Sequence, residues 1–239
     1  MIIIHTNDMH NHPGSKLEAI VEGYRSNQEI ILLDAGDAVS ATNITCTTHE
    51  PILQKMSEMQ YDAMTLGNRE FHFSASGMRS TLQDAKFPVL CANIDMTRGE
   101  LDYITPYIIL DRWGMNIGIF GLIVPMITEK MKVKHLSVFR FHKPLKIAEE
   151  VVKTLRVDHK VDMVIALTHI GYSQDRELAA SVKGIDIIIG GHSHTVLPEG
   201  EWINETLITQ TGSHGKYIGE VHFEPESSPK FSAKLVDSK

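Results

Sequence analysis

The feature that most constrains this chain is a series of short apolar runs, each of which ends in polar residues able to bind a metal ion. The polar stretches are HTNDMH, DAGD, GNRE, TH and GGHSH, and the runs before them span Ile2–Ile4, Ile30–Leu33, Ala63–Leu66, Met163–Leu167 and Ile185–Ile189. Continuous rather than alternating apolar runs are typical of strands buried on both faces, as in sheets covered by helices. We therefore predict a layered α/β fold in which polar side chains gather where the strands end.

Helical patterns lie between these runs. The expected helices cover residues 16–27, 51–60, 78–85 and 144–158, and the last starts with a proline in a favoured first-turn position. Four apolar residues of that helix share one face at helical spacing and predict core packing: Leu145, Ala148, Val152 and Leu155.

The remaining apolar segments have a more antiparallel character, because turn signals such as Trp113-Gly114 interrupt them. They cover residues 88–94, 107–123, 206–212 and 217–225. The stretch Pro225–Lys230 predicts a turn before a final short strand. Together these segments predict extra antiparallel strands and hence mixed sheets.

The composition supports one α/β domain over residues 1–239, since 42% hydrophobic residues can fill a sizeable core and no repeat or linker-like stretch divides the chain. The net charge of −7 gives no support for binding nucleic-acid polymers or membrane surfaces, which need a basic face. Neither Cys46 nor Cys91 lies in a redox or zinc-binding spacing, and we expect both to be buried small residues. The start MIIIHTND lacks a basic or cleavable leader, and no apolar run could cross a bilayer, so we expect a cytoplasmic protein.

Seven oxygen and nitrogen donors follow the five predicted strands. Each is a weak signal when taken singly, but ligands gather beyond the carboxyl ends of the strands in open α/β sheets, so the donors can converge. The candidate metal ligands are Asp8, His10, Asp37, Asn68, His169, His192 and His194. This set mixes carboxylate, amide and imidazole groups and exceeds what one tetrahedral ion takes. It fits two ions about 3.5–4 Å apart that share a carboxylate.

The order of these motifs resembles the calcineurin-like metallophosphoesterase family. The blocks HTNDMH, LLDAGD, AMTLGNREF, LTHIG, IIIGGHSHT and GSHGKYIGEV are together similar to its 5′-nucleotidase and UDP-sugar hydrolase branch, from Ile2 to about Phe223. The resemblance implies a four-layer α/β/β/α sandwich with mixed sheets and an active site at the carboxyl ends of the strands.

The resemblance also implies how two divalent ions would be held and used. The implied ligand sets, with Asp37 in both as the bridge, are Asp8, His10, Asp37 and His194 for one ion and Asp37, Asn68, His169 and His192 for the other. Water held by such ions loses a proton near neutral pH and attacks the phosphate ester as hydroxide, while the ions neutralise the developing charge. Glu70 fits either a role in orienting a ligand or that of a capping carboxylate.

The sequence departs from the branch's usual Gly-Asn-His-Glu-Phe-Asp pattern at two positions. Arg69 and His72 stand where that pattern has a histidine that approaches the phosphate and an aspartate that orients the histidine. Arginine stays protonated and cannot shuttle a proton, but it binds phosphate oxygens in a bidentate manner. We therefore interpret Arg69 as an electrostatic clamp and His72 as a candidate proton donor. A leaving group that needs little protonation, slow activity and an inactive protein are the alternatives.

Two further departures concern a turn and the length of the chain. Asn11 stands where many relatives have glycine, and we expect a turn before Pro13 rather than a contribution to the pocket rim. The chain resembles only the N-terminal part of nucleotidases of this branch, so we expect no C-terminal domain for base recognition. We also expect an open site, which a second copy of the chain or a protein partner could cover.

These features predict a binuclear metal-dependent phosphoesterase that hydrolyses a small phosphate monoester or diester, such as a nucleotide or another phosphorylated metabolite. Manganese, zinc, iron, cobalt and nickel all suit carboxylate and imidazole ligands. Two alternatives stay open: a non-catalytic, metal-stabilised protein that binds a phosphorylated ligand or a partner, and a hydrolase of sulfate esters or thiosulfonates. The complete donor set favours an enzyme, whereas Arg69 favours the binding protein.

Overall fold

Two six-stranded mixed sheets form the centre of the computed structural model, which describes residues 1–41, 44, 50–99, 101–128 and 130–239. Cys46 lies outside these described residues, whereas Cys91 is buried as expected. None of the helices in the described ranges is both long and apolar enough to span a bilayer.

The first sheet combines a parallel centre with an antiparallel edge. Its strands, in spatial order, are β14 (Phe231–Asp237), β13 (Tyr217–Phe223), β1 (Ile2–Thr6), β2 (Ile30–Asp34), β3 (Ala63–Thr65) and β4 (Val89–Leu90). Strands β1 to β4 run parallel, with Ile4 opposite Leu32. Strand β13 is antiparallel to both β1 and β14, and the chain turns between β13 and β14 at residues 225–230, as predicted.

The second sheet has the same mixed character. Its strands, in spatial order, are β11 (Glu201–Ile203), β12 (Thr206–Thr209), β10 (Ile187–Gly190), β9 (Met163–His169), β7 (Met115–Ile123) and β6 (Tyr107–Arg112). The four central strands are parallel and the two edge strands are antiparallel to their neighbours. Trp113 and Gly114 form the predicted turn of the β6–β7 hairpin, with φ angles of 57° and 72° that suit a two-residue hairpin loop.

Helices cover the outer faces of both sheets. They are α1 (Leu17–Arg25), α2 (Pro51–Glu58), α3 (Ala75–Leu82), α4 (Pro144–Lys153) and α5 (Tyr172–Ser181). Two short helical segments, η1 (Lys132–His135) and η2 (Thr154–Asp158), and a two-stranded sheet of β5 (Ile94–Met96) and β8 (Phe139–Phe141) complete the described elements.

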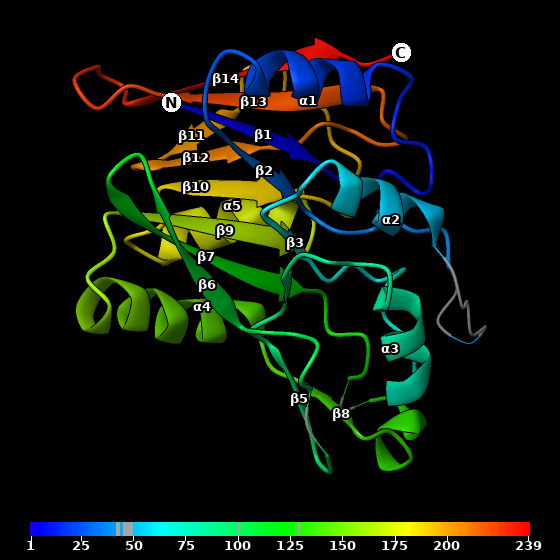
Figure 1. Ribbon diagram of the computed structural model, residues 1–239. Coiled ribbons are helices and arrows are strands. Elements are labelled where there is room, and N and C mark those ends of the chain that lie inside the picture. Colours follow the sequence, from blue (N-terminus) through cyan, green and yellow to red (C-terminus); the bar gives the residue numbers. More distant parts are fainter. Residues whose placement is uncertain (42–43, 45–49, 100, 129) are drawn as a thin grey trace.

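Three clusters of buried apolar side chains confirm the predicted α/β/β/α layers (Figure 1). Ile31 of the first sheet and Ile165 of the second belong to the cluster between the sheets. Leu17 of α1 joins Leu32 in the cluster on the outer face of the first sheet. Val152 of α4 belongs to the cluster on the outer face of the second sheet. The side chains of each β-strand therefore pack on both of its faces, which explains the continuous apolar runs.

The predicted helices differ from the observed ones mainly at their boundaries. Helix α3 starts earlier than expected, because the Ser74 side chain caps it by accepting a hydrogen bond from the amide of Gly77. Helix α5 was not predicted, since its sequence is largely polar and buries only Asp175, Leu178 and Ala179. The expected core face of the helix after Pro144 is confirmed: Ala148, Val152 and Leu155 are buried, and Leu145 is partly buried against them.

Candidate metal centre

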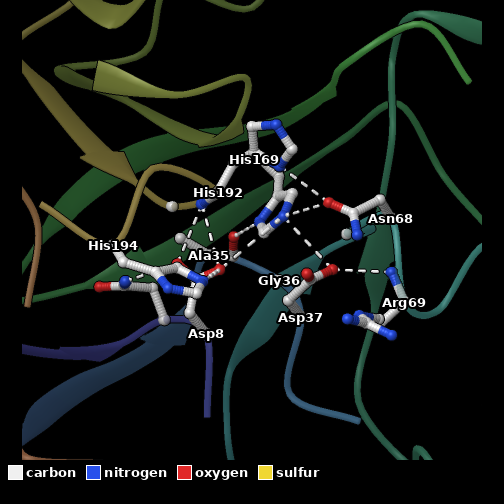
Figure 2. Close-up of polar contacts among 12 residues, drawn as sticks. Asp8, Ala35, Gly36, Asp37, Asn68, Arg69, His169, His192 and His194 are labelled. Carbon is white, nitrogen blue, oxygen red and sulfur yellow. Dashed lines mark hydrogen bonds and ion pairs between the residues drawn. The ribbon is translucent and has the colours of Figure 1, made fainter. Parts of the chain in front are cut away.

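The seven candidate ligands lie at one edge of the molecule, at the carboxyl ends of parallel strands from both sheets. In chain order, Asp8 and His10 follow β1, Asp37 follows β2, Asn68 follows β3, His169 ends β9, and His192 and His194 follow β10. Because these strands are parallel within each sheet, their ends open on the same side, as the arrowheads of β1, β7 and β10 indicate in Figure 1. Figure 2 shows the side chains of candidate ligands pointing toward one another: Asp8, Asp37, Asn68, His169, His192 and His194.

Asp8, His10 and His194 form one group with metal-binding potential. Their ligand atoms all lie within 4.8 Å of one another. Nε2 of His194 is 3.3 Å from Oδ1 of Asp8 and 3.3 Å from Nε2 of His10. The Asp8 side chain is fully buried and accepts a hydrogen bond of 2.9 Å from the backbone amide of His192, so its orientation is held by the GGHSH turn.

Asp8, Asp37 and His169 form the second group. Nε2 of His169 lies 3.3 Å from Oδ1 of Asp37 and 4.0 Å from Oδ1 of Asp8. The side-chain oxygen of Asn68 extends this group, since it is 3.1 Å from Nε2 of His169 and 2.8 Å from Nδ1 of His192. All seven donors therefore belong to one continuous cluster.

The two groups have Asp8 in common, whereas the family resemblance implies Asp37 as the bridging residue. The carboxylates of Asp8 and Asp37 are both buried. The bridging role of Asp37 stays a prediction, and the geometry makes Asp8 the residue to compare it with.

Hydrogen bonds and neighbouring charges set the ring orientation and the protonation of His169. Nδ1 of its buried ring lies 2.8 Å from the carbonyl oxygen of Ala35 and donates to it, so Nε2 faces the cluster (Figure 2). Burial by itself lowers the pKa of His169, but the neighbouring carboxylates of Asp37 and Asp8 raise it to about 10. Burial likewise favours a raised pKa for Asp37, yet the His169 imidazolium holds that pKa below its usual range. A divalent cation would replace this proton, as expected of a metal site.

Five of the seven donor residues have a left-handed backbone. Asp8, His10, Asp37, His192 and His194 have φ angles between 49° and 74°. Residues other than glycine rarely adopt this region, and such strain concentrates at functional sites where surrounding contacts hold it. Here the contacts include hydrogen bonds from the amide of Asp8 to the carbonyl of Gly36 and from the amide of His10 to that of Asp37.

The glycines of the GD and GN motifs let the two loops after β2 and β3 approach closely. A Cβ atom on Gly67 would lie 2.2 Å from the amide nitrogen of Asp37, and one on Gly36 would lie 2.9 Å from the backbone of Gly67. Both distances are shorter than a side chain tolerates. The glycines are therefore required for Asp37 and Asn68 to meet.

Glu70 joins the same two loops through its carboxylate. This buried side chain accepts hydrogen bonds from the backbone amides of Asp37 at 3.0 Å, Val39 at 3.1 Å and Gly67 at 2.9 Å. Burial, and secondly the charge of Asp37, raise the pKa of Glu70 to about 7. The contacts combine the two interpretations of the sequence analysis, since Glu70 caps backbone amides and thereby orients Asp37.

Asn7 and Gln210 support the cluster, and the sequence analysis did not identify either residue. Nδ2 of Asn7 donates hydrogen bonds of 2.8 Å both to Oδ2 of Asp8 and to the carbonyl of Gly212. Gln210 donates from Nε2 to the carbonyl of Gly191 at 3.1 Å and accepts from the hydroxyl of Ser193 at 3.0 Å. The available signals were a buried amide directly before Asp8 and another directly after the apolar strand β12.

Arg69 and His72 have different surroundings although they are three residues apart. Arg69 is exposed, and its backbone amide donates a 2.7 Å hydrogen bond to Oδ1 of Asp37 (Figure 2). His72 is buried, and its Nδ1 lies 3.0 Å from the amide of Ser74 and 2.9 Å from the Ser74 hydroxyl at the start of α3. A Cβ atom on Gly77 would lie 2.2 Å from the same nitrogen. Arg69 therefore borders the cluster, whereas the His72 ring packs against α3, and its proton-donor role stays a prediction.

The expected turn before Pro13 is present. The amide of His12 donates a 2.8 Å hydrogen bond to the carbonyl of Met9, and the side chain of Asn11 donates to Glu50 at 3.2 Å. The rings of His12 and His214 stack with their centroids 5.7 Å apart. The His214 ring also lies 5.1 Å from that of His10, between centroids, so two further imidazoles adjoin the ligand group that contains His10.

The chemistry of the donor set fits divalent cations. Carboxylate and amide oxygens with imidazole nitrogens suit first-row transition metals, and no thiolate is present among them. The ring orientation of His169 and the buried, hydrogen-bonded Asp8 are the kind of support that metal ligands normally have.

Comparison with known proteins agrees with this arrangement. Residues 1–196 match the model of the calcineurin-like phosphoesterase family. The chain is 34% identical over 263 residues to the trifunctional nucleotide phosphoesterase protein YfkN of Bacillus subtilis, an alignment that covers 92% of this chain and 18% of that protein. It is 27% identical over 266 residues to protein UshA of Yersinia enterocolitica, covering 93% of this chain and 48% of UshA. The chain therefore spans less than half the length of these relatives.

A solved structure with the same fold is that of the sulfate thiohydrolase SoxB of Thermus thermophilus. It superposes with a TM-score of 0.82 at 15% identity, covering 99% of this chain and 56% of SoxB. The fold is therefore that of metallophosphoesterases, and the family match covers most of the sequence. The chain belongs to the calcineurin-like phosphoesterase family, whose members use binuclear divalent metal centres.

Proposed function

We propose that this chain hydrolyses small phosphate esters with the help of two divalent metal ions. The observation that carries the proposal is the convergence of seven oxygen and nitrogen donors, from strands of both sheets, on one cluster in which Asp8, Asp37 and His169 are buried. When bound there, the ions would supply Lewis-acid activation of the phosphoryl group and of the attacking water. The ligand assignments of the sequence analysis are part of this proposal.

The chain's own residues bind and orient the phosphoryl group. Arg69 borders the cluster with an exposed side chain, so its guanidinium can reach the oxygens of a bound phosphate. It would stabilise the negative charge that increases on those oxygens during displacement, which charged donors do best at a preorganised site. Because the guanidinium stays protonated, Arg69 binds charge and does not deliver the proton to the leaving group.

A nucleotide or a similar phosphorylated metabolite is the substrate class we favour. The name of YfkN, which describes a nucleotide phosphoesterase, supports this choice. Both monoesters and diesters are compatible with Arg69, since it neutralises charge without selecting a leaving group. A second copy of the chain or a partner would cover the open site. A cytoplasmic location and the identity of the ions stay predictions.

Metal-dependent turnover is the test of the proposed function. The protein would be stripped of metal, reloaded with manganese and assayed with paired nitrophenyl monoesters and diesters, nucleotides and a thiosulfonate. We expect hydrolysis of a phosphate ester that a chelator abolishes and added metal restores. The preferred ester decides between monoesterase and diesterase. Two bound ions without turnover would overturn the proposal in favour of a phosphate-binding protein, and turnover of the thiosulfonate alone would favour a sulfur ester hydrolase.

A further inference from the structure

A basic pocket is lined by residues that do not belong to the candidate metal centre. Its volume is about 710 Å³, and its wall includes Pro125, Ile127, Phe141, Lys134, Arg140 and Lys143. The wall thus combines apolar side chains with three cations.

Two connections join the wall of this pocket to segments that carry residues of the candidate site. The amide of Val124 donates a 3.1 Å hydrogen bond to the carbonyl of His169, and Pro125 in the pocket wall is the next residue along the chain, one peptide step of about 3.8 Å away. On the other side, the ring of Phe71 packs against Phe141, with centroids 5.3 Å apart. Phe71 is two residues from Arg69, so elements that carry residues of the candidate site border the pocket on both sides.

The second connection also rigidifies the pocket wall. Phe71 is fully buried and contacts Phe139, whose ring centroid is likewise 5.3 Å away. Phe139 and Phe141 belong to β8, and the pocket is lined by both. The loop of Arg69 and the strand of Arg140 therefore share one packed aromatic cluster, which sets the position of the pocket relative to the site.

The charge of the segment around the pocket is one-sided. Residues 130–148 contain no aspartate or glutamate and six permanent cations: Lys130, Lys132, Lys134, Arg140, Lys143 and Lys146. Among the described residues, Arg140 and Lys143 make no ion pair, whereas His142 on the same rim is bonded to Asp95 at 2.9 Å. Unpaired cations in a concavity with apolar walls attract anions, because the walls focus the field.

We propose that this pocket binds a second anionic group of the substrate, so that the preferred substrates carry a phosphate or carboxylate beyond the phosphoryl group that reacts. The inference rests on the proposed function, because it takes the reacting group to lie at the metal cluster. Arg140 and Lys143 are the residues that determine this specificity. Their side chains are exposed to the pocket, so they can form charge-assisted hydrogen bonds with a bound anion.

Matched substrate pairs test the proposal on the manganese-loaded chain. The pairs are adenosine 5′-monophosphate with adenosine 3′,5′-bisphosphate, the same monophosphate with adenosine 5′-diphosphate, and glucose 6-phosphate with glucose 1,6-bisphosphate. We expect kcat/KM to be roughly 10- to 100-fold higher for the doubly phosphorylated member of at least one pair. In the double variant Arg140→Ala/Lys143→Ala this preference should fall to near one through a higher KM, with the monophosphate unaffected.

A charge-matched control distinguishes binding in the pocket from long-range attraction by positive charge elsewhere on the surface. The double variant Lys146→Ala/Lys153→Ala removes the same charge from α4, outside the pocket wall, and should keep the preference. The proposal would be overturned if both double variants lost the preference for the doubly phosphorylated substrate equally, or if the wild type showed no preference in any pair. If no compound is hydrolysed, the proposed function fails. In that case calorimetric binding of the same pairs still tests the pocket. The doubly phosphorylated member must bind more tightly, and this advantage must be lost in the Arg140→Ala/Lys143→Ala variant.

Discussion

Arg69 combines an exposed cationic side chain with a backbone amide that donates a hydrogen bond to the buried carboxylate of Asp37. A change of its side chain therefore leaves the Asp37 contact in place. This separation makes position 69 the most direct probe of how the leaving group is protonated.

Replacing Arg69 with His should restore a group that can donate a proton near neutral pH. We expect hydrolysis of alkyl phosphates, which are poor leaving groups, to accelerate roughly 10- to 100-fold, with a much smaller change for nitrophenyl phosphate. The ratio of kcat for the two esters measures this effect. Arg69→Lys is the matched control, since it keeps the charge but loses the bidentate geometry. No gain in a folded Arg69→His variant would show that other contacts protonate the leaving group.

Asp37 should be essential for holding both ions. Its carboxylate lies 3.3 Å from His169 and accepts the amide hydrogen of Arg69, so Asp37→Ala removes a ligand and frees a neighbouring donor. We expect fewer than two ions per chain, measured by elemental analysis after dialysis, and loss of turnover. Asp8→Ala is the informative comparison, because Asp8 belongs to both ligand groups. Exposed Asp111 provides a neutral control. Two ions retained by the Asp37→Ala variant would disprove its bridging position.

At the scale of single elements, His72 contacts the N-terminal turn of α3, which predicts a structural role for its ring. Removing the ring in His72→Ala leaves the amide of Ser74 without its acceptor, and we expect a loss of about 1–3 kcal/mol in unfolding free energy. His72→Asn can still accept at the Nδ1 position and should recover most of this loss. Urea denaturation measures both. If instead both variants lose activity only on esters with poor leaving groups, His72 acts as the proton donor after all.

Helix α5 contributes a buried carboxylate whose charge destabilises the fold. Asp175 accepts a 2.6 Å hydrogen bond from Thr168 of β9, but its Oδ2 has no partner within the described part of the chain. Burial raises its pKa to about 7, well above the value of a free aspartate. The native state therefore binds this proton more tightly than the unfolded state does. Its contribution to stability is complete below about pH 4 and is lost as the pH rises to 7.

Asp175→Asn should remove this pH dependence while keeping the acceptor for Thr168. Relative to the wild type, the variant should gain about 2–3 kcal/mol in unfolding free energy between pH 5 and pH 8. Urea denaturation at the two pH values measures the gain. Asp111→Asn on the exposed edge strand is the control, for which the difference should not change with pH. If the unfolding free energies of the wild type and Asp175→Asn differed by the same amount at both pH values, the raised pKa of Asp175 would be contradicted.

At the scale of the whole molecule, the cluster connects the two sheets, since Asp8 and Asp37 follow strands of the first and His169 ends a strand of the second. Ions bound there would stabilise the native state by about 4 kcal/mol at a thousandfold excess over their dissociation constant. For a chain of this size we expect a chelator to lower the melting temperature by roughly 10 °C. The Asp37→Ala variant should show a much smaller shift. An unchanged wild-type melting temperature would mean that the ions do not link the sheets.

Much of the fold and of the candidate site is predictable because the relevant signals are local. A continuous apolar run reports burial on both faces of a strand, and the residues that follow it must lie at that strand's end, as Asp8 and Asp37 do. Once the runs are recognised as parallel strands, convergence of their polar ends follows from the geometry of the sheets. Helix α5 was not predicted, because it buries so few side chains that its sequence has little apolar periodicity.

The sequence by itself determined the layered α/β architecture and the family, and it predicted the seven candidate ligands, because each depends on a local pattern or on the order of motifs along the chain. Tertiary structure alone decided that the His72 ring packs against α3, that Asp8 belongs to both ligand groups, and that Gln210 holds the GGHSH turn. It also built the basic pocket, by packing Phe71 against β8. The physical reason is that the direction of a side chain depends on partners distant in sequence, which no local pattern records.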